Sequence, residues 1–298
     1  MSPTRLSPND WFPAGRADIN ARRVITAGDL ALRVLEAGPA DGPPVLLLHG
    51  WAVSAYLWRH NIAALAAAGF RVYAPDLPGH GLSDAPSSRG AYSLAAMTGY
   101  VGALMDALGL RSASVVAQSM GGRIALEVAR EQRGRVARLA LFGPVGFGDI
   151  SERKAYAPFV PVLPGAIPSL LVTRRVVEIV QRRVHGKLGW FTERDIDEYW
   201  APTQFPQLVR AQLQMLREFD WELHDPAELR AVPVPTLVVF GTLDRTVKPS
   251  RAATLVAALP HGRLEWIEDG GHVVMEEVPD RVNRMLVQFL RTEGAAPE

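Results

Sequence analysis

The chain has 298 residues, which is enough for one large domain or two modest ones and for a sizeable buried core. Its 32 basic and 31 acidic residues give a net charge of +1, which provides no electrostatic reason to expect a nucleic acid or an anionic membrane as partner. The absence of cysteine excludes disulfides and thiolate metal sites, and no apolar run approaches the roughly 18 residues that span a bilayer.

The chain begins with a Pro-rich arm over residues 1–21, which contains no apolar segment of the kind found in secretory signals. We therefore expect a cytoplasmic protein that does not insert into a membrane and that acts on a small molecule. Two strand-like runs follow at residues 22–26 and 30–36, and the Gly-Asp turn between them predicts a β-hairpin.

Strands and helices then alternate as far as residue 142. Further strands are predicted at residues 43–48, 70–74 and 136–142 and from residue 113 to the residue before Ser119, with helices at residues 56–68 and 94–108 and directly after Ser119. Strands alternating with helices of this length form right-handed crossovers, which build a parallel sheet covered on both faces. The predicted fold class is therefore α/β.

The pattern changes between residues 147 and 225. Strand patterns vanish there, and Pro-interrupted helical segments rich in Arg, Glu, Leu and aromatic residues appear. The alternation then resumes, with strands predicted at residues 236–240 and 264–267 and helices at residues 250–259 and 282–290. We expect one core domain made of residues 22–146 and 226–292, with a helical cap inserted at residues 147–225.

Ser119 lies where a β-branched apolar strand pattern meets a helix pattern rich in small residues. On such a tight turn a serine hydroxyl is exposed above the sheet, and the N–H groups that follow point at whatever binds there. A serine in this place could instead simply cap the helix. Asp244 follows the predicted strand 236–240, and His272 lies in the loop after the predicted strand that ends at residue 267, so both fall at strand ends, where open parallel sheets place their sites.

Ser119, Asp244 and His272 are the three residue types that nucleophilic acyl transfer needs. The serine hydroxyl needs a base to take its proton, neutral imidazole is that base near pH 7, and a carboxylate holds the imidazole in the correct tautomer. Negative charge on the carbonyl oxygen requires N–H donors, for which the backbone N–H groups of Met120 and Trp51 are the candidates. Asp149 also follows a strand and is the rival acid.

The chain resembles a lid-bearing member of the α/β-hydrolase family over residues 22–290. The resemblance is carried by five motifs in order: His49-Gly50, Asp76-x-x-Gly79-x-Gly81-x-Ser83, Gln118-Ser119-Met120-Gly121-Gly122, Asp244 after its strand, and Gly271-His272 followed by Glu277-x-Pro279. It implies the α/β-hydrolase fold, a structural role for the loop 76–83, and a non-catalytic Glu277. The family's usual Gly is replaced by Ala117, which is small enough for the turn.

The family's dehalogenases and epoxide hydrolases resemble this chain around His49, but they use an aspartate nucleophile where this chain has Ser119. His49 and His80 are expected to stabilise loops, whereas His185 and His224 have no partner pattern and are expected at the surface. The predicted cap carries nearly equal numbers of basic and acidic residues and many aromatic ones, which favours an apolar substrate. The candidate pocket residues are Phe147, Phe159, Trp190 and Val273.

These observations predict a serine esterase that cleaves carboxylic esters of apolar, short-to-medium substrates through an acyl-enzyme and needs no cofactor or metal. A hydrolase of C–C bonds in meta-cleavage-type diketone acids would use the same residues, although such enzymes resemble one another in carrying Trp where this chain has Val273. A cofactor-free perhydrolase or an acyltransferase also fits, because the triad does not identify the acyl acceptor. A non-catalytic binding protein with this fold is a remote alternative.

Overall fold

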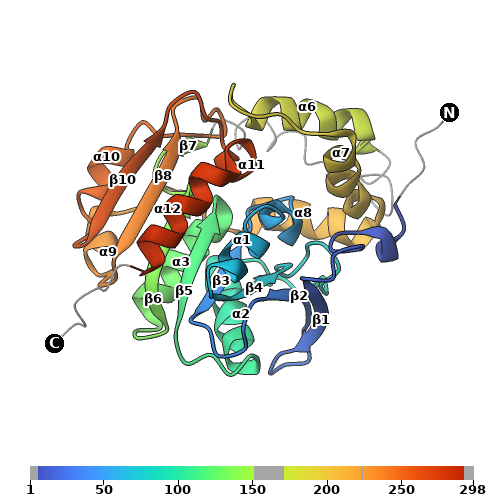
Figure 1. Cartoon of the computed structure of the whole chain (residues 1–298), viewed down its shortest axis with the longest axis horizontal. Helices are drawn as coiled ribbons and strands as arrows, with labels where there is room; N and C mark the ends of the chain where they lie inside the picture. The colour runs from blue at the N-terminus through green and yellow to red at the C-terminus, as the bar shows by residue number, and fades with distance from the viewer. Residues whose placement is uncertain (1–5, 151–170, 223, 292–298) are drawn as a thin grey trace.

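The computed structural model in Figure 1 describes residues 6–150, 171–222 and 224–291. Its centre is an eight-stranded sheet with the order β1-β2-β4-β3-β5-β6-β8-β10. The strands are β1 (Asn20–Ile25), β2 (Ala31–Ala37), β3 (Pro44–Leu48), β4 (Arg71–Pro75), β5 (Ala113–Gln118), β6 (Val136–Phe142), β8 (Thr236–Gly241) and β10 (Gly262–Ile267). Strand β2 pairs antiparallel with β1 and β4, and every pairing from β4 to β10 is parallel. The predicted α/β fold is confirmed.

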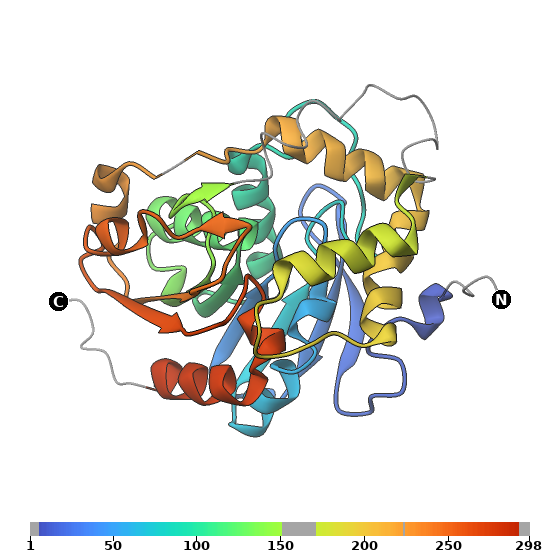
Figure 2. The ribbon, with the colours of Figure 1, turned by 90° about the horizontal axis from the view of Figure 1, so that it is seen from above.

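Helices cover both faces of the sheet, and strand β3 shows how the two faces are filled. Leu46 and Leu48 belong to the buried cluster that includes α2, α3 and α10, whereas Val45 and Leu47 belong to the cluster that includes α1, α11 and α12. Figure 2 shows α12 and α3 on opposite sides of the strands. The helices of the core are α1 (Ile62–Ala67), α2 (Leu94–Ala107), α3 (Met120–Glu131), α9 (Pro226–Arg230), α10 (Ala252–Val256), α11 (Val274–Glu277) and α12 (Pro279–Arg291).

Three helical segments between β6 and β8 are grouped on one side of the molecule in Figure 1. They are α6 (Arg174–Val184), α7 (Glu193–Trp200) and α8 (Pro206–Glu218), with the 3-10 turn η4 (Ala201–Gln204) between the last two. Gln212 of α8 joins this region to the core, because its side chain donates to the carbonyl of Gly79 at 2.7 Å and accepts from the N–H of Ala52 at 3.1 Å.

Two local predictions differ from the structure. The helix predicted at residues 56–68 is divided into the 3-10 turn η2 (Ala55–Trp58) and α1, because the N–H of Ala55 bonds to the Asp76 carboxylate at 2.8 Å and Asn61 bonds to Asn283 at 2.6 Å. A second, two-stranded sheet pairs β7 (Asp149–Ile150) with β9 (Val247–Lys248), at the start of the expected cap. Two-residue strands carry no periodic signal, so this pairing has no counterpart in the sequence pattern.

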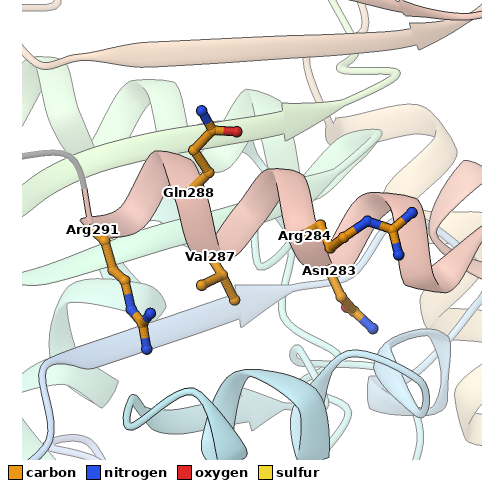
Figure 3. Close-up of a pocket in the computed structure, with 5 residues that line it drawn as sticks. All are labelled: Asn283, Arg284, Val287, Gln288 and Arg291. Carbon is orange, nitrogen blue, oxygen red and sulfur yellow. The ribbon is translucent and has the colours of Figure 1, made fainter.

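A shallow hollow of about 350 Å³ follows α12 (Figure 3). Its lining comes from one helix face, and Arg291 and Asn283 at its two ends bond to the carbonyls of Ala68 and His60. The lining residues are Asn283, Arg284, Val287, Gln288 and Arg291. The hollow contains none of the predicted site residues. None of the helices described above is long and apolar enough to cross a membrane.

Candidate active site

Ser119 occupies the sharp turn between β5 and α3. Its backbone has φ 53° and ψ −118°, a conformation that an L-residue adopts only when its surroundings force it to. The N–H of Ser119 bonds to the carbonyl of Phe142 at 2.9 Å, which joins the turn to β6. The Ser119 side chain makes no capping hydrogen bond to α3, so the structure does not support the helix-cap alternative.

Small residues let the backbone pack closely around this turn. A Cβ atom on Gly121 would lie 2.6 Å from the carbonyl oxygens of both Leu48 and His49, so α3 begins directly against the end of β3. A Cβ atom on Gly50 would lie 2.2 Å from Oε1 of Gln118 and 3.0 Å from Cβ of Ser119. The turn after β3 therefore lies against the turn at Ser119, as the choice of Trp51 as an oxyanion donor requires.

His272 and Asp244 are in direct contact, although they are 28 positions apart in the chain. Nδ1 of His272 lies 2.7 Å from Oδ2 of Asp244, and Oδ1 of Asp244 accepts the N–H groups of Thr246 and Val247 at 2.9 Å each. An ionised carboxylate can only accept hydrogen bonds, so the ring nitrogen that faces it must be the donor. Nδ1 of His272 therefore carries the hydrogen. In this tautomer Nε2 carries the ring lone pair, which is the one that can accept a proton.

The rival acid, Asp149, lies elsewhere. Its carboxylate accepts a hydrogen bond from the hydroxyl of Ser250 at 2.9 Å, and its residue is exposed at the start of the small second sheet. Of the two candidate acids, the structure therefore brings Asp244 to His272.

His49 orients the peptide group that carries the N–H of Trp51. Its Nε2 accepts the N–H of Leu77 at 2.9 Å, so the proton is on Nδ1, which donates to the carbonyl of Gly50 at 2.7 Å. Burial lowers the pKa of His49, which keeps the ring neutral in this arrangement. In a trans peptide the N–H points opposite to the C=O, so fixing the Gly50 carbonyl also fixes the direction of the Trp51 N–H.

The two predicted oxyanion donors have different surroundings. Met120 is the first residue of α3, where backbone N–H groups have no acceptor within the helix. Trp51 is anchored through its indole, which donates to the carbonyl of Gln212 at 3.2 Å and meets the ring of Trp221 edge to face. Among the residues that the structure describes, none accepts a hydrogen bond from the backbone N–H of Trp51 or of Met120.

The candidate pocket residues differ in their surroundings. Phe147 is fully buried in the same cluster as Met120, and Val273 is buried in the cluster on the other side of the sheet. Trp190 is 59% exposed and stacks on Phe191. Phe159 lies outside the described residues. The substrate pocket therefore stays a prediction.

The prediction that His185 and His224 lie at the surface is wrong. Both are buried, and Nδ1 of His224 lies 2.6 Å from Nη1 of Arg123 on α3. The partner of His224 lies 101 positions away, whereas His185 bonds to the carbonyl of Gln181 one helical turn earlier and contacts the ring of Phe191. The prediction that His49 and His80 stabilise loops is confirmed by their hydrogen bonds. His49 accepts the N–H of Leu77, and Nδ1 of His80 lies 3.0 Å from the carbonyl of Pro78.

The fold and this arrangement define an α/β hydrolase. Residues 43–279 match the alpha/beta hydrolase fold family, and the chain belongs to that family.

Three similar proteins show the range of names within the family. The chain is 31% identical to a haloalkane dehalogenase of Psychrobacter cryohalolentis, over 88% of both chains. It is 33% identical to the magnesium-chelatase 30 kDa subunit of Rhodobacter capsulatus, over 97% of this chain and 99% of the relative. Among solved structures, 2-hydroxy-6-oxo-6-phenylhexa-2,4-dienoate hydrolase from Rhodococcus sp. strain RHA1 superposes with a TM-score of 0.78 at 26% identity, covering 92% of this chain and 99% of that one.

Proposed function

We propose that the protein is a serine hydrolase that cleaves carboxylic esters with apolar acyl or alcohol groups. The observation that carries the proposal is the 2.7 Å contact between Nδ1 of His272 and Oδ2 of Asp244, at the same sheet edge as Ser119 in its forced turn. The strands that precede these residues, β5, β8 and β10, lie within four consecutive positions of the sheet.

In the proposed reaction Ser119 attacks the ester carbonyl carbon while Nε2 of His272 takes the hydroxyl proton. The negative charge that develops on the carbonyl oxygen is stabilised by the N–H groups of Trp51 and Met120. The protonated His272 then gives its proton to the leaving alcohol, and an acyl-enzyme is left on Ser119. A water molecule, deprotonated by His272, attacks the acyl carbon and releases the acid, after which the proton returns to Ser119. The cycle consumes one ester and one water.

The nucleophile separates this proposal from a haloalkane dehalogenase. Displacement of a halide by a carboxylate gives an ester that water can hydrolyse at its acyl carbon, which releases the alcohol and regenerates the carboxylate with one oxygen from water. An alkylated serine would be an ether, which that water cannot cleave. Ser119 therefore favours acyl chemistry over dehalogenation, although the chain is 31% identical in sequence to a haloalkane dehalogenase.

A C–C bond hydrolase of dienoate substrates is the second candidate, and the structural similarity to the Rhodococcus dienoate hydrolase favours it. It would use the same three residues with a carbon leaving group. Val273, which follows the proposed base, is the departure that counts against it.

A substrate panel tests the proposal. We expect p-nitrophenyl esters of graded acyl length to be hydrolysed with higher kcat/KM than a ring-fission dienoate, and no halide to be released from haloalkanes. A dienoate kcat/KM above that of every ester would replace the proposal with the second candidate. Halide release would contradict both.

A further inference from the structure

A short segment of the helical region between β6 and β8 is bonded directly to the loop that carries His272. This segment, residues 184–187, is called the strap here. The carbonyl of Val184 accepts the backbone N–H of His272 at 2.7 Å, and the N–H of Lys187 donates to the carbonyl of Asp269 at 2.8 Å. The pairing of residue 184 with 272 and of 187 with 269 runs antiparallel, so the strap lies along the loop as a short strand would.

The Glu277 carboxylate holds the strap and the loop together. Its Oε1 accepts the N–H of Gly271 at 2.7 Å, and its Oε2 accepts the N–H of Gly186 at 2.9 Å. Glu277 is only 5% exposed, and burial raises its pKa. Hydrogen bonds to a carboxylate in such surroundings are stronger than those between neutral groups. One side chain therefore bridges the residue before His272 and the middle of the strap.

The two glycines show how closely the segments approach. A Cβ atom on Gly186 would lie 2.2 Å from the carbonyl oxygen of Asp269 and 2.5 Å from the nitrogen of Gly271. A Cβ atom on Gly271 would lie 2.3 Å from the carbonyl oxygen of Val184 and 2.4 Å from the nitrogen of Gly186. Both positions need glycine for the contact to form, and neither contact tolerates a side chain without moving the backbone that carries His272.

Besides Glu277, which belongs to α11, the two segments carry charged and titratable groups of their own. Nζ of Lys187 forms an ion pair with Oδ1 of Asp269 at 2.9 Å on the exposed side. On the buried side, Nδ1 of His185 lies 2.8 Å from the carbonyl of Gln181, which ties the strap back to α6. Glu277 is thus the acceptor on which the backbone donors of both segments converge.

We propose that Glu277 is a positioning residue for His272, and that by holding the strap against the loop it makes the placement of His272 depend on the region between β6 and β8. The inference rests on the proposed function of His272. Glu277 acts through the backbone, so its loss displaces the imidazole without removing any group that touches the substrate. A misplacement of about 1 Å in such a site costs on the order of a hundredfold in rate.

The kinetic test compares Glu277→Gln with Glu276→Gln. Glu276 is the adjacent buried carboxylate, and it binds Arg59 and Tyr199 instead of the loop. In E277Q the amide nitrogen would face one of the two N–H donors, so one bond is lost and the other is kept. We expect E277Q to lower kcat by about 10- to 100-fold with KM within about twofold, and to shift the pKa that governs kcat/KM. E276Q should lower the thermal midpoint without that shift.

A second pair of variants tests the strap from its other side. Gly186→Ala should reproduce the kinetic signature of E277Q, because its new Cβ displaces the loop. Gly99→Ala is the matched control, since a Cβ on Gly99 meets nothing within 4 Å. Equal kinetics in E277Q and E276Q, or wild-type kinetics in folded G186A, would overturn the proposal.

Amide hydrogen exchange provides a readout that does not depend on catalysis. In E277Q, residues 184–187 and 269–272 should exchange faster together, by about the same factor, while β5 is unchanged. Faster exchange in only one of the two segments would contradict the coupling. If Ser119→Ala kept ester hydrolysis, the proposed function would fail, but this exchange pattern would still decide whether Glu277 joins the strap to the loop.

Discussion

Nδ1 of His272 and Oδ2 of Asp244 lie 2.7 Å apart, and the Asp244 side chain is completely buried. The other carboxylate oxygen is held by two backbone N–H groups, so Asp244 has no freedom to turn away from the ring. The contact fixes both the orientation and the tautomer of His272. In the proposed reaction it also provides a negative partner for the imidazolium of His272.

Replacing Asp244 with Asn should remove this control while keeping the shape of the side chain. The amide can present its N–H₂ to Nδ1, which favours the wrong tautomer, and we expect kcat for ester hydrolysis to fall by roughly 10⁴. Steady-state kinetics with circular dichroism to verify folding would measure the effect. Asp149→Asn is the matched control and should stay near wild type. A large loss in D149N with little loss in D244N would reverse the assignment.

His49→Ala should impair the proposed oxyanion hole without touching the triad. Without the bond from Nδ1 to the Gly50 carbonyl, the Trp51 N–H loses its fixed direction. Complete loss of one oxyanion donor costs about 100- to 1000-fold in kcat. Because His49→Ala only loosens the Trp51 N–H, we expect its kcat to fall by no more than this range. His80→Ala is the control, because His80 is an equally buried neighbour that bonds to Pro78 instead. Equal kcat values in the two variants would contradict the role of His49.

His224 should make the fold less stable in mild acid. Burial, with Arg123 as the second cause, lowers the pKa of His224 to about 2, whereas the unfolded chain has the ordinary value of about 6.5. Below pH 6.5 the unfolded state therefore binds a proton at His224 that the folded state does not bind. The free energy of unfolding is unaffected by this group well above pH 6.5 and decreases below it. Between pH 7.5 and pH 5.0 this group removes about 2 kcal/mol.

Urea unfolding at these two pH values would measure that loss. His224→Asn keeps an acceptor near Arg123 but does not titrate, so the variant should lose about 2 kcal/mol less than wild type over the interval. Identical pH dependence in the two proteins would show that the pKa of His224 is the same in the folded and unfolded states, which would contradict the prediction.

Arg59 holds two buried carboxylates where α7 meets the core. It pairs with Asp195 of α7 at 2.8 Å and with Glu276 of α11. Arg59→Met would leave both carboxylates without their cation, and we expect a loss of about 3–5 kcal/mol in the free energy of unfolding. Arg16→Met removes an exposed pair with Asp18 and should cost roughly 0–1 kcal/mol. If denaturant unfolding showed comparable losses of stability in Arg59→Met and Arg16→Met, burial would not be what makes the Arg59 ion pairs important.

The core could be read from the sequence because its signals are local. Strand β6 has the bounds predicted from its apolar run, the hairpin β1–β2 follows from its turn, and Ser119 lies between strand and helix as predicted. The contact between Asp244 and His272 could be expected because parallel strands end at one edge of the sheet, so residues that follow different strands lie close together.

The remaining features depend on contacts between distant residues. Gly186 and Glu277 are 91 positions apart. The sequence around neither residue indicates that the Glu277 carboxylate binds both Gly186 and the loop before His272. His224 is buried and contacts Arg123, which is 101 positions away in the chain. Such pairs are set by how the region between β6 and β8 packs on the core, which periodicity does not describe.

The central claim is that Ser119 forms a covalent acyl-enzyme, and mass spectrometry of the protein quenched during turnover of a p-nitrophenyl ester tests it most directly. We predict a mass increase equal to the acyl group, located on the peptide that contains Ser119, and its absence in Ser119→Ala together with loss of ester hydrolysis in a folded protein. Undiminished hydrolysis by folded S119A, or an adduct on another residue, would contradict the account.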